Sequence, residues 1–133
     1  MNRRYSKTVY AGTLAIGGNT PISVQSMLNA AADDIAGNVA QAIALEQAGC
    51  QMVRVAIPNK NAVALIPAIK EVVTIPLFAD IHFDYRLALE AAAAGIDKIR
   101  INPGNIGSDD RVKAVAKVCR EKNIPIRIGV NSG

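Results

Sequence analysis

The stretch that decides the fold is residues 97–107, Asp-Lys-Ile-Arg-Ile-Asn-Pro-Gly-Asn-Ile-Gly. Its first half alternates like a strand, and its second half is a loop of Pro, Gly and Asn that cannot continue the strand. An arginine between two isoleucines is unusual there, because ionised side chains are almost never fully buried unless they are paired. The stretch therefore predicts a strand whose arginine has a specific partner.

The same arginine pattern occurs three times, at residues 53–55, 99–101 and 126–128. Three strands thus each contribute one arginine to a sheet that is otherwise apolar. The simplest account is a multiply charged anion bound where the strands converge, and the residues that would hold it are Arg54, Arg100 and Arg127.

Strands and helices alternate along the rest of the chain. A short β-hairpin is expected over residues 8–19. Core strands are predicted at residues 21–27, 51–57, 75–80, 97–101 and 124–130. Helices are predicted at residues 33–49, 60–72, 84–95 and 108–123, the second of them kinked or split at Pro67.

This order predicts an α/β fold built from βα units. A faint repeat supports it, since residues 48–55 and 94–101 each read as a helix end, a glycine and an arginine-bearing strand. Near-continuous apolar strands indicate a parallel sheet covered by helices. A (β/α)₈ barrel needs eight units in roughly 250 residues. We therefore expect 1–133 to be one partial TIM-barrel domain, with units one to four and strand five in 20–133.

A small open flavodoxin-like sheet is the alternative fold. It is less favoured because no glycine-rich phosphate loop follows the first predicted strand. In a barrel, the active site lies at the carboxyl ends of the strands, and the arginines lie near those ends.

Composition excludes several classes of function. The net charge is only +4, and three Tyr and two Phe are the only aromatic residues, so nucleic-acid binding is poorly supported. No apolar run reaches the roughly 20 residues that span a bilayer. Cys50 and Cys119 are far apart in the sequence and have no partner at metal-ligand spacing, so we expect buried free thiols, no metal site and a reducing, cytoplasmic setting.

Alternation along the strands predicts which polar groups share a face. Arg100 and Asn102 are on one face of their strand, and Arg127, Gly129 and Asn131 are on one face of theirs. If that face is the barrel mouth, phosphate is the natural ligand, because arginine binds it through two hydrogen bonds and stays charged. The alternative is that each arginine pairs with a buried Asp or extends outward between helices.

Two further segments follow strand ends. Asp80, His82 and Asp84 alternate, which suits substrate contact by Asp80 or His82, an acid/base pair or half of a metal site. The same run suits a hydrogen-bond network in which Asp84 only caps the next helix. Residues 102–107 are either a plain connection or a loop whose backbone amides face a phosphate.

Together, these motifs closely resemble the 4-hydroxy-3-methylbut-2-enyl diphosphate synthase family, the iron–sulfur enzymes of the non-mevalonate isoprenoid pathway. The resemblance covers essentially the whole chain. The matching segments are residues 21–27, 53–55, 79–86, 100–107 and 125–133.

The resemblance implies a TIM-barrel domain that binds 2-C-methyl-D-erythritol 2,4-cyclodiphosphate. In this family a separate C-terminal domain carries a [4Fe–4S] cluster, and two chains form a homodimer in which one cluster domain closes over the other barrel. Ferredoxin or flavodoxin supplies two electrons, which open the cyclic diphosphate and remove a hydroxyl as water. Matched by motif, the substrate-binding residues are Arg54, Asp80, His82, Arg100, Asn102, Arg127 and Asn131.

The chain departs from the family in two respects. Residues 28–32 replace a threonine-rich segment, so no role is expected for that loop. The rest of the barrel and the cluster domain are absent, and Cys50 and Cys119 do not match the cluster ligands, so we expect an N-terminal fragment that holds no cofactor and is inactive alone. The alternatives are a pterin-binding TIM-barrel enzyme and a non-catalytic half-barrel with internally paired arginines.

Overall fold

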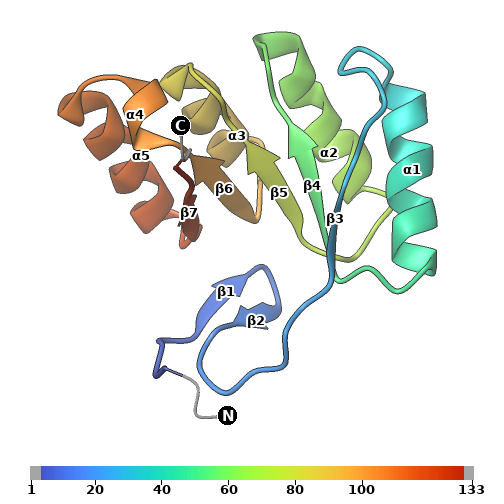
Figure 1. The fold of residues 1–133 in the computed structure, drawn as a ribbon. Helices are drawn as coiled ribbons and strands as arrows, with labels where there is room; N and C mark the ends of the chain where they lie inside the picture. The colour runs from blue at the N-terminus through green and yellow to red at the C-terminus, as the bar shows by residue number, and fades with distance from the viewer. Residues whose placement is uncertain (1–3, 131–133) are drawn as a thin grey trace.

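The computed structural model describes residues 4–130, and its centre is a parallel sheet of five strands. Each strand pairs with the next one along the chain (Figure 1). This sequential order is that of a barrel wall; a flavodoxin-like sheet has the order 2-1-3-4-5, so that alternative is wrong. The strands, each within its predicted range, are β3 (Gln25–Met27), β4 (Met52–Ala56), β5 (Leu77–Asp80), β6 (Lys98–Ile101) and β7 (Ile126–Ile128).

The larger helices lie on one side of this sheet (Figure 1). Within residues 4–130, no helix has the length and apolar content needed to cross a membrane. The helical segments are α1 (Ile35–Gln47), the 3₁₀ segment η1 (Lys60–Ala64), α2 (Leu65–Lys70), α3 (Tyr85–Ala93), α4 (Pro103–Ile106) and α5 (Asp109–Glu121).

Aspartate side chains cap the starts of two helices. Asp34 Oδ1 accepts the backbone N–H of Gly37 at 2.8 Å at the start of α1. Asp84 Oδ1 accepts that of Arg86 at 3.0 Å at the start of α3. Ser108 precedes α5, but its side chain makes no capping hydrogen bond. The α5 start instead has two aspartates in its first turn, where negative charge is favourable.

The predicted internal repeat is confirmed in the backbone. Helix α1 ends before Gly49 and α3 ends before Gly95, and these glycines have φ of +96° and +93°. A left-handed residue after the last helical turn ends a helix, and glycine adopts it without strain. In each copy, two residues separate the glycine from a strand with an arginine at its third position.

Two local predictions need correction. The segment 60–72 is split, but the break falls at Leu65, because Pro67 lies in the first turn of α2, where a missing N–H costs nothing. Residues 102–107 are not a plain loop. Asn102 and Pro103 start the single-turn helix α4, since Asn is a good cap and Pro is favoured at the first helical position.

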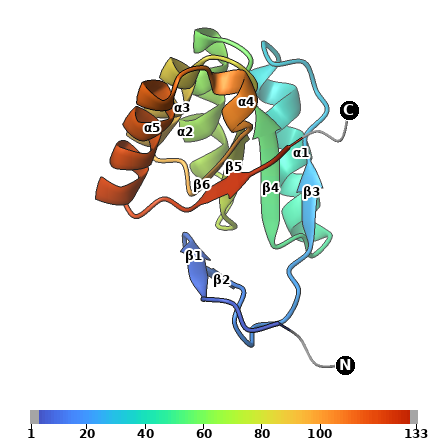
Figure 2. The same cartoon turned by 60° about the vertical axis from the view of Figure 1, so that its left-hand side comes forward.

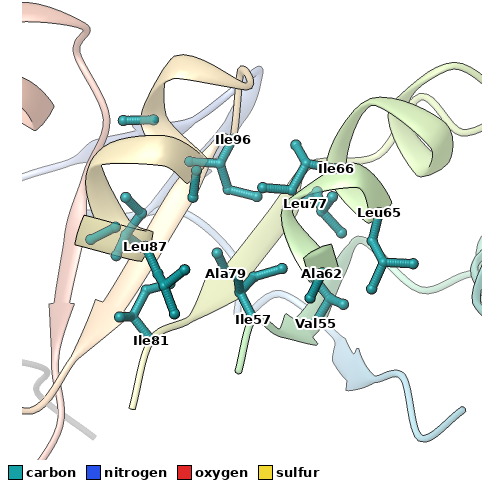
Figure 3. Close-up of a cluster of buried hydrophobic side chains, with 14 of the residues drawn as sticks. Val55, Ile57, Ala62, Leu65, Ile66, Leu77, Ala79, Ile81, Leu87 and Ile96 are labelled. Carbon is teal, nitrogen blue, oxygen red and sulfur yellow. The ribbon is translucent and has the colours of Figure 1, made fainter. Parts of the chain in front are cut away.

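The main core lies between the sheet and the helices (Figure 3). Alternate residues of the central strands point to this side, and helical side chains such as Leu65, Ile66 and Leu87 pack against them. The buried strand residues on this side are Val53, Val55, Leu77, Ala79, Ile99 and Ile101.

The hairpin covers part of the opposite face. Strands β1 (Val9–Ala11) and β2 (Leu14–Ile16) pair antiparallel, as predicted. Ala11 packs with Met52 and Phe78, near the starts of β4 and β5. In Figures 1 and 2 the hairpin lies below the ends at which the strands begin. The carboxyl-terminal half of the helix-free face therefore remains for polar side chains.

Candidate functional site

The strand register gathers the predicted arginines on the helix-free face. Asp80 is aligned with Arg100, and Arg100 with Arg127. Ala56 is aligned with Asp80, and Arg54 lies two residues earlier on the same face of β4. Four neighbouring strands thus place their polar side chains at one end of one face.

Asp80 is the centre of this group. Its side chain is 1% exposed, whereas those of Arg54 and Arg100 are 25% and 17% exposed. Asp80 Oδ2 accepts hydrogen bonds from Nε of Arg54 at 3.1 Å and from its Nη2. Asp80 Oδ1 accepts one from Nη1 of Arg100 at 3.3 Å.

The alternative in which the arginines pair with a buried aspartate is therefore met in part. Arg54 and Arg100 do pair with a buried aspartate, but they share a single one instead of having one each. A shared carboxylate neutralises one guanidinium charge and leaves the other in excess. It also fixes both guanidinium groups in place, because a buried carboxylate needs its partners.

This face carries two further cations, Arg127 and Lys98. Neither has a carboxylate partner among residues 4–130. Arg127 is exposed on β7. Lys98 is half-buried, with Nζ 4.7 Å from the ring centroid of Phe78. Burial, and after it the charge of Arg127, lowers the pKa of Lys98. Sequence reasoning missed Lys98, although it lies two residues before Arg100 and so on the same face.

His82 lies beside this cluster. Its Nε2 is 3.5 Å from Asp80 Oδ2, and its side chain is 44% exposed. Asp84 turns away to cap α3 and to contact Nε of Arg86 at 3.3 Å. The backbone N–H of Arg86 lowers the pKa of Asp84. The helix-cap interpretation of Asp84 is confirmed, and residues 4–130 contain no group of three side chains suited to a metal.

Of the two predicted carboxamides, the structure describes Asn102 but not Asn131. Asn102 is buried, and its Oδ1 accepts the backbone N–H of Gly104 at 3.0 Å, which starts α4 directly after the arginine strand. Asn131 lies outside the described residues. The loop after β3, which departs from the family pattern, is fixed to α1, since Gln41 Oε1 accepts the N–H groups of Asn29 and Ala30 at 3.1 and 3.0 Å.

A cleft of about 510 Å³ lies on the other side of the strand ends, between η1 and α3. It is lined by both signs of charge, and the charges pair there, with Lys60 Nζ 3.9 Å from Glu90 Oε1 and Arg86 Nε 3.3 Å from Asp84 Oδ1. This balance makes the cleft a poorer anion site than the Asp80 cluster.

The chain's cysteines do not fit an iron–sulfur cluster. Cys50 follows α1, Cys119 lies on α5, and both are buried. Burial raises the pKa of the Cys119 thiol, which disfavours the thiolate that iron binds. A cluster of this kind generally needs four such ligands, and this chain has only two cysteines.

Comparison with known proteins identifies the family of this chain. The family model described as the GcpE TIM-barrel domain matches residues 6–133. A Histophilus somni protein named 4-hydroxy-3-methylbut-2-en-1-yl diphosphate synthase (flavodoxin) is 53% identical over 133 residues, which are 100% of this chain and 36% of the relative. A Pseudomonas aeruginosa protein of the same name is 54% identical over 131 residues, 98% of this chain and 35% of the relative.

An Actinobacillus pleuropneumoniae protein with that name is 51% identical over 133 residues, 100% of this chain and 36% of the relative. The chain thus spans about a third of the length of the curated relatives that it matches. The partial α/β barrel, the arginine strands and the family match agree, and the chain belongs to the GcpE TIM-barrel domain family.

Proposed function

We propose that this chain is the part of a 4-hydroxy-3-methylbut-2-enyl diphosphate synthase that holds the diphosphate of the substrate. One observation carries the proposal: the helix-free face bears four cations, and a single carboxylate pairs with two of them. The cations are Arg54, Lys98, Arg100 and Arg127, and the carboxylate is Asp80. A doubly phosphorylated ligand would compensate the charge that Asp80 leaves unbalanced.

Asp80 already holds some of the proposed diphosphate-binding residues, and the others are not held by it. Asp80 holds Arg54 and Arg100 in place before a ligand arrives, which lowers the ordering cost of binding. Arg127 is exposed at the adjacent strand and can approach a second phosphate group. Asn102, Asn131 and His82 are proposed to bind the remaining polar atoms of the substrate.

The full reaction belongs to the whole protein and is also a proposal. The substrate would be 2-C-methyl-D-erythritol 2,4-cyclodiphosphate, and the electron donor would be flavodoxin, as in the relatives' name, or ferredoxin. A [4Fe–4S] cluster in a C-terminal domain would pass the electrons to the substrate. The whole protein would be a cytoplasmic homodimer. The residues of this chain would bind and orient the diphosphate and take no part in electron transfer.

The shared ion pair at Asp80 also favours one rival, a non-catalytic half-barrel whose arginines are paired internally. The absence of any carboxylate partner for Arg127 and Lys98 within residues 4–130 argues against it. A pterin-binding barrel is less compatible, because Asp80 is almost fully buried and already accepts from two arginines, which limits its access to a pterin N–H.

Calorimetric titration of the 133-residue chain separates these functions. We expect inorganic pyrophosphate and the cyclic diphosphate to bind and a pterin not to bind. Arg100→Met should weaken pyrophosphate binding about tenfold to a hundredfold, the value of a charge-assisted hydrogen bond. Arg120→Met is the matched control, since Arg120 is exposed in the last turn of α5. Equal affinities in the two variants would contradict the proposal.

A further inference from the structure

Phe78 lies on the helix-free face between two of its cations. Arg54 on β4 is aligned with Phe78 on β5, and Phe78 is aligned with Lys98 on β6. Cζ of Arg54 is 5.7 Å from the centroid of the Phe78 ring, and Nζ of Lys98 is 4.7 Å from it. Both distances are within the roughly 6 Å at which the face of an aromatic ring attracts a cation. One ring therefore contacts two cations of the proposed site.

The two cations approach the ring from opposite sides. Strands β4 and β6 flank β5, and the three strands run parallel. Arg54 therefore reaches one side of the ring and Lys98 the other. The ring also stands between two like charges, which would otherwise face each other across a smaller residue.

The Phe78 side chain is itself held in place. Phe78 is fully buried. It packs with Met52 of β4 and with Ala11 of the hairpin, and Leu14 and Ile16 of the hairpin pack against this cluster. The hairpin lies below the ends at which the strands begin (Figure 2). Because a buried side chain in a close-packed cluster keeps one rotamer, the ring is a fixed platform for the cations on either side.

Lys98 depends on this platform because no carboxylate balances it among residues 4–130. Its acidic neighbour Asp97 is paired with α2, where Nζ of Lys70 is 2.8 Å from Asp97 Oδ1. The single carboxylate that pairs with cations of this face is shared by two arginines. The charged groups that the sheet strands place on this face with Lys98 are Arg54, Asp80, Arg100 and Arg127.

The ring opposes the effects that disfavour the Lys98 ammonium. Burial, and after it the charge of Arg127, lowers the pKa of Lys98. A cation over the face of a ring is stabilised in its charged form. The contact with Phe78 therefore favours the ammonium that an anionic ligand needs.

We infer that Phe78 is a positioning residue that holds the Lys98 ammonium in place for an anionic ligand, with the Arg54 guanidinium on the other side of the ring. The identity of the ligand rests on the proposed function, but the contact between Phe78 and Lys98 can be tested without any ligand. In this arrangement the ring acts through the two cations.

The first test changes the electrons of the ring and keeps its shape. The chain has two phenylalanines, so in a Phe83→Leu chain a fluorinated phenylalanine supplied during expression enters only at position 78. Fluorine withdraws electron density from the ring face, which weakens its attraction for a cation. In NMR titrations without ligand, we expect the pKa of Lys98 to be lower with the fluorinated ring than with the ordinary ring. An unchanged pKa would overturn the inference.

The second test measures pyrophosphate binding by calorimetry. Phe78→Leu should weaken binding about twofold to fivefold. In the Lys98→Met background the same substitution should cost less, because part of its effect acts through Lys98. Met52→Leu is the matched control, since it changes a neighbour of Phe78 in the same cluster at nearly constant volume and should leave binding unchanged.

An equal loss of pyrophosphate affinity with and without Lys98, or an equal loss in Met52→Leu, would also overturn the inference. If pyrophosphate does not bind the wild-type chain at all, the proposed diphosphate function fails. The effect of the fluorinated ring on the pKa of Lys98 then still decides whether Phe78 holds the ammonium.

Discussion

Asp80 is the residue on which the site depends. It is almost fully buried, and its two oxygens accept from arginines of the two neighbouring strands. Removing one partner of a buried ion pair is costly because the other charge stays behind without compensation. Here two charges would stay behind, although both arginines retain some contact with solvent.

Asp80→Asn should therefore destabilise the chain by about 2–4 kcal/mol in urea unfolding, somewhat less than a fully buried pair would. Pyrophosphate should restore more stability to this variant than to the wild type, because the anion replaces the lost carboxylate. Asp84→Asn is the control on the same segment. It keeps a good helix cap and should change stability by less than about 0.5 kcal/mol. Equal losses in the two variants would contradict the central place of Asp80.

Lys98 gives the site a pH dependence. Its pKa is lowered by burial and then by Arg127, so the folded state disfavours the protonated ammonium. The resulting cost to stability is full below the folded-state pKa and disappears as the pH rises through it towards the unfolded value of about 10.4. Lys98→Met removes this cost at every pH.

The free energy of unfolding of Lys98→Met, relative to wild type, should thus be most favourable near pH 7 and should decline towards pH 10. Urea unfolding of both proteins across this range measures it. The variant keeps an apolar contact with Phe78 but loses the cation–π contact of Lys98, which offsets part of the gain at neutral pH. If the difference in free energy of unfolding between the two proteins did not vary with pH, the pKa of Lys98 would not be lowered in the folded state.

At the scale of elements, two helix caps separate an effect on stability from an effect on ligand binding. Asp34 caps α1, which precedes the first arginine strand, and Asn102 caps α4 directly after Arg100. Asn102→Ala and Asp34→Ala should each cost about 1 kcal/mol in urea unfolding. Only Asn102→Ala should also weaken pyrophosphate binding, because the Asn102 carboxamide is proposed to contact the substrate. Equal binding by the two variants would remove Asn102 from the site.

The sequence predicts the elements well because their signals are local. The caps Asp34 and Asp84 and the stops Gly49 and Gly95 act within one turn of the helix that they bound. The one-turn helix α4 was missed because an Asn-Pro pair that starts a helix resembles an Asn-Pro pair in a turn.

The site was predicted in part. Strand alternation correctly places Arg100 and Arg127 on one face, because side chains in a strand repeat every second residue. That Arg54 and Arg100 share Asp80 depends on the register between strands, which a single sequence does not specify. Lys98 follows the same alternation as Arg100 and was available to the same reasoning.

At the scale of the whole molecule, the sheet has two edges in residues 4–130, β3 and β7. Large apolar side chains are exposed along both, among them Val24, Met27, Ile128 and Val130. Unpaired strand edges with apolar residues tend to associate with other strands. This open arrangement is consistent with a chain that matches about a third of its relatives' length.

The chain of 133 residues should not turn over the cyclic diphosphate by itself, even with reduced flavodoxin. The physical reason is that its two buried cysteines cannot hold a [4Fe–4S] cluster. An anaerobic assay for the ring-opened product, with a full-length relative as positive control, measures this. Product formation by the chain alone would refute the proposal that this chain binds the diphosphate and takes no part in electron transfer.

The central claim is that the cations on the carboxyl-terminal half of the helix-free face compensate a diphosphate. A crystal structure of the chain with the cyclic diphosphate tests it most directly. The account predicts phosphate oxygens within hydrogen-bond distance of Arg100 and Arg127, with Asp80 still holding Arg54. A ligand bound elsewhere, or an unoccupied arginine cluster at saturating ligand, would contradict it.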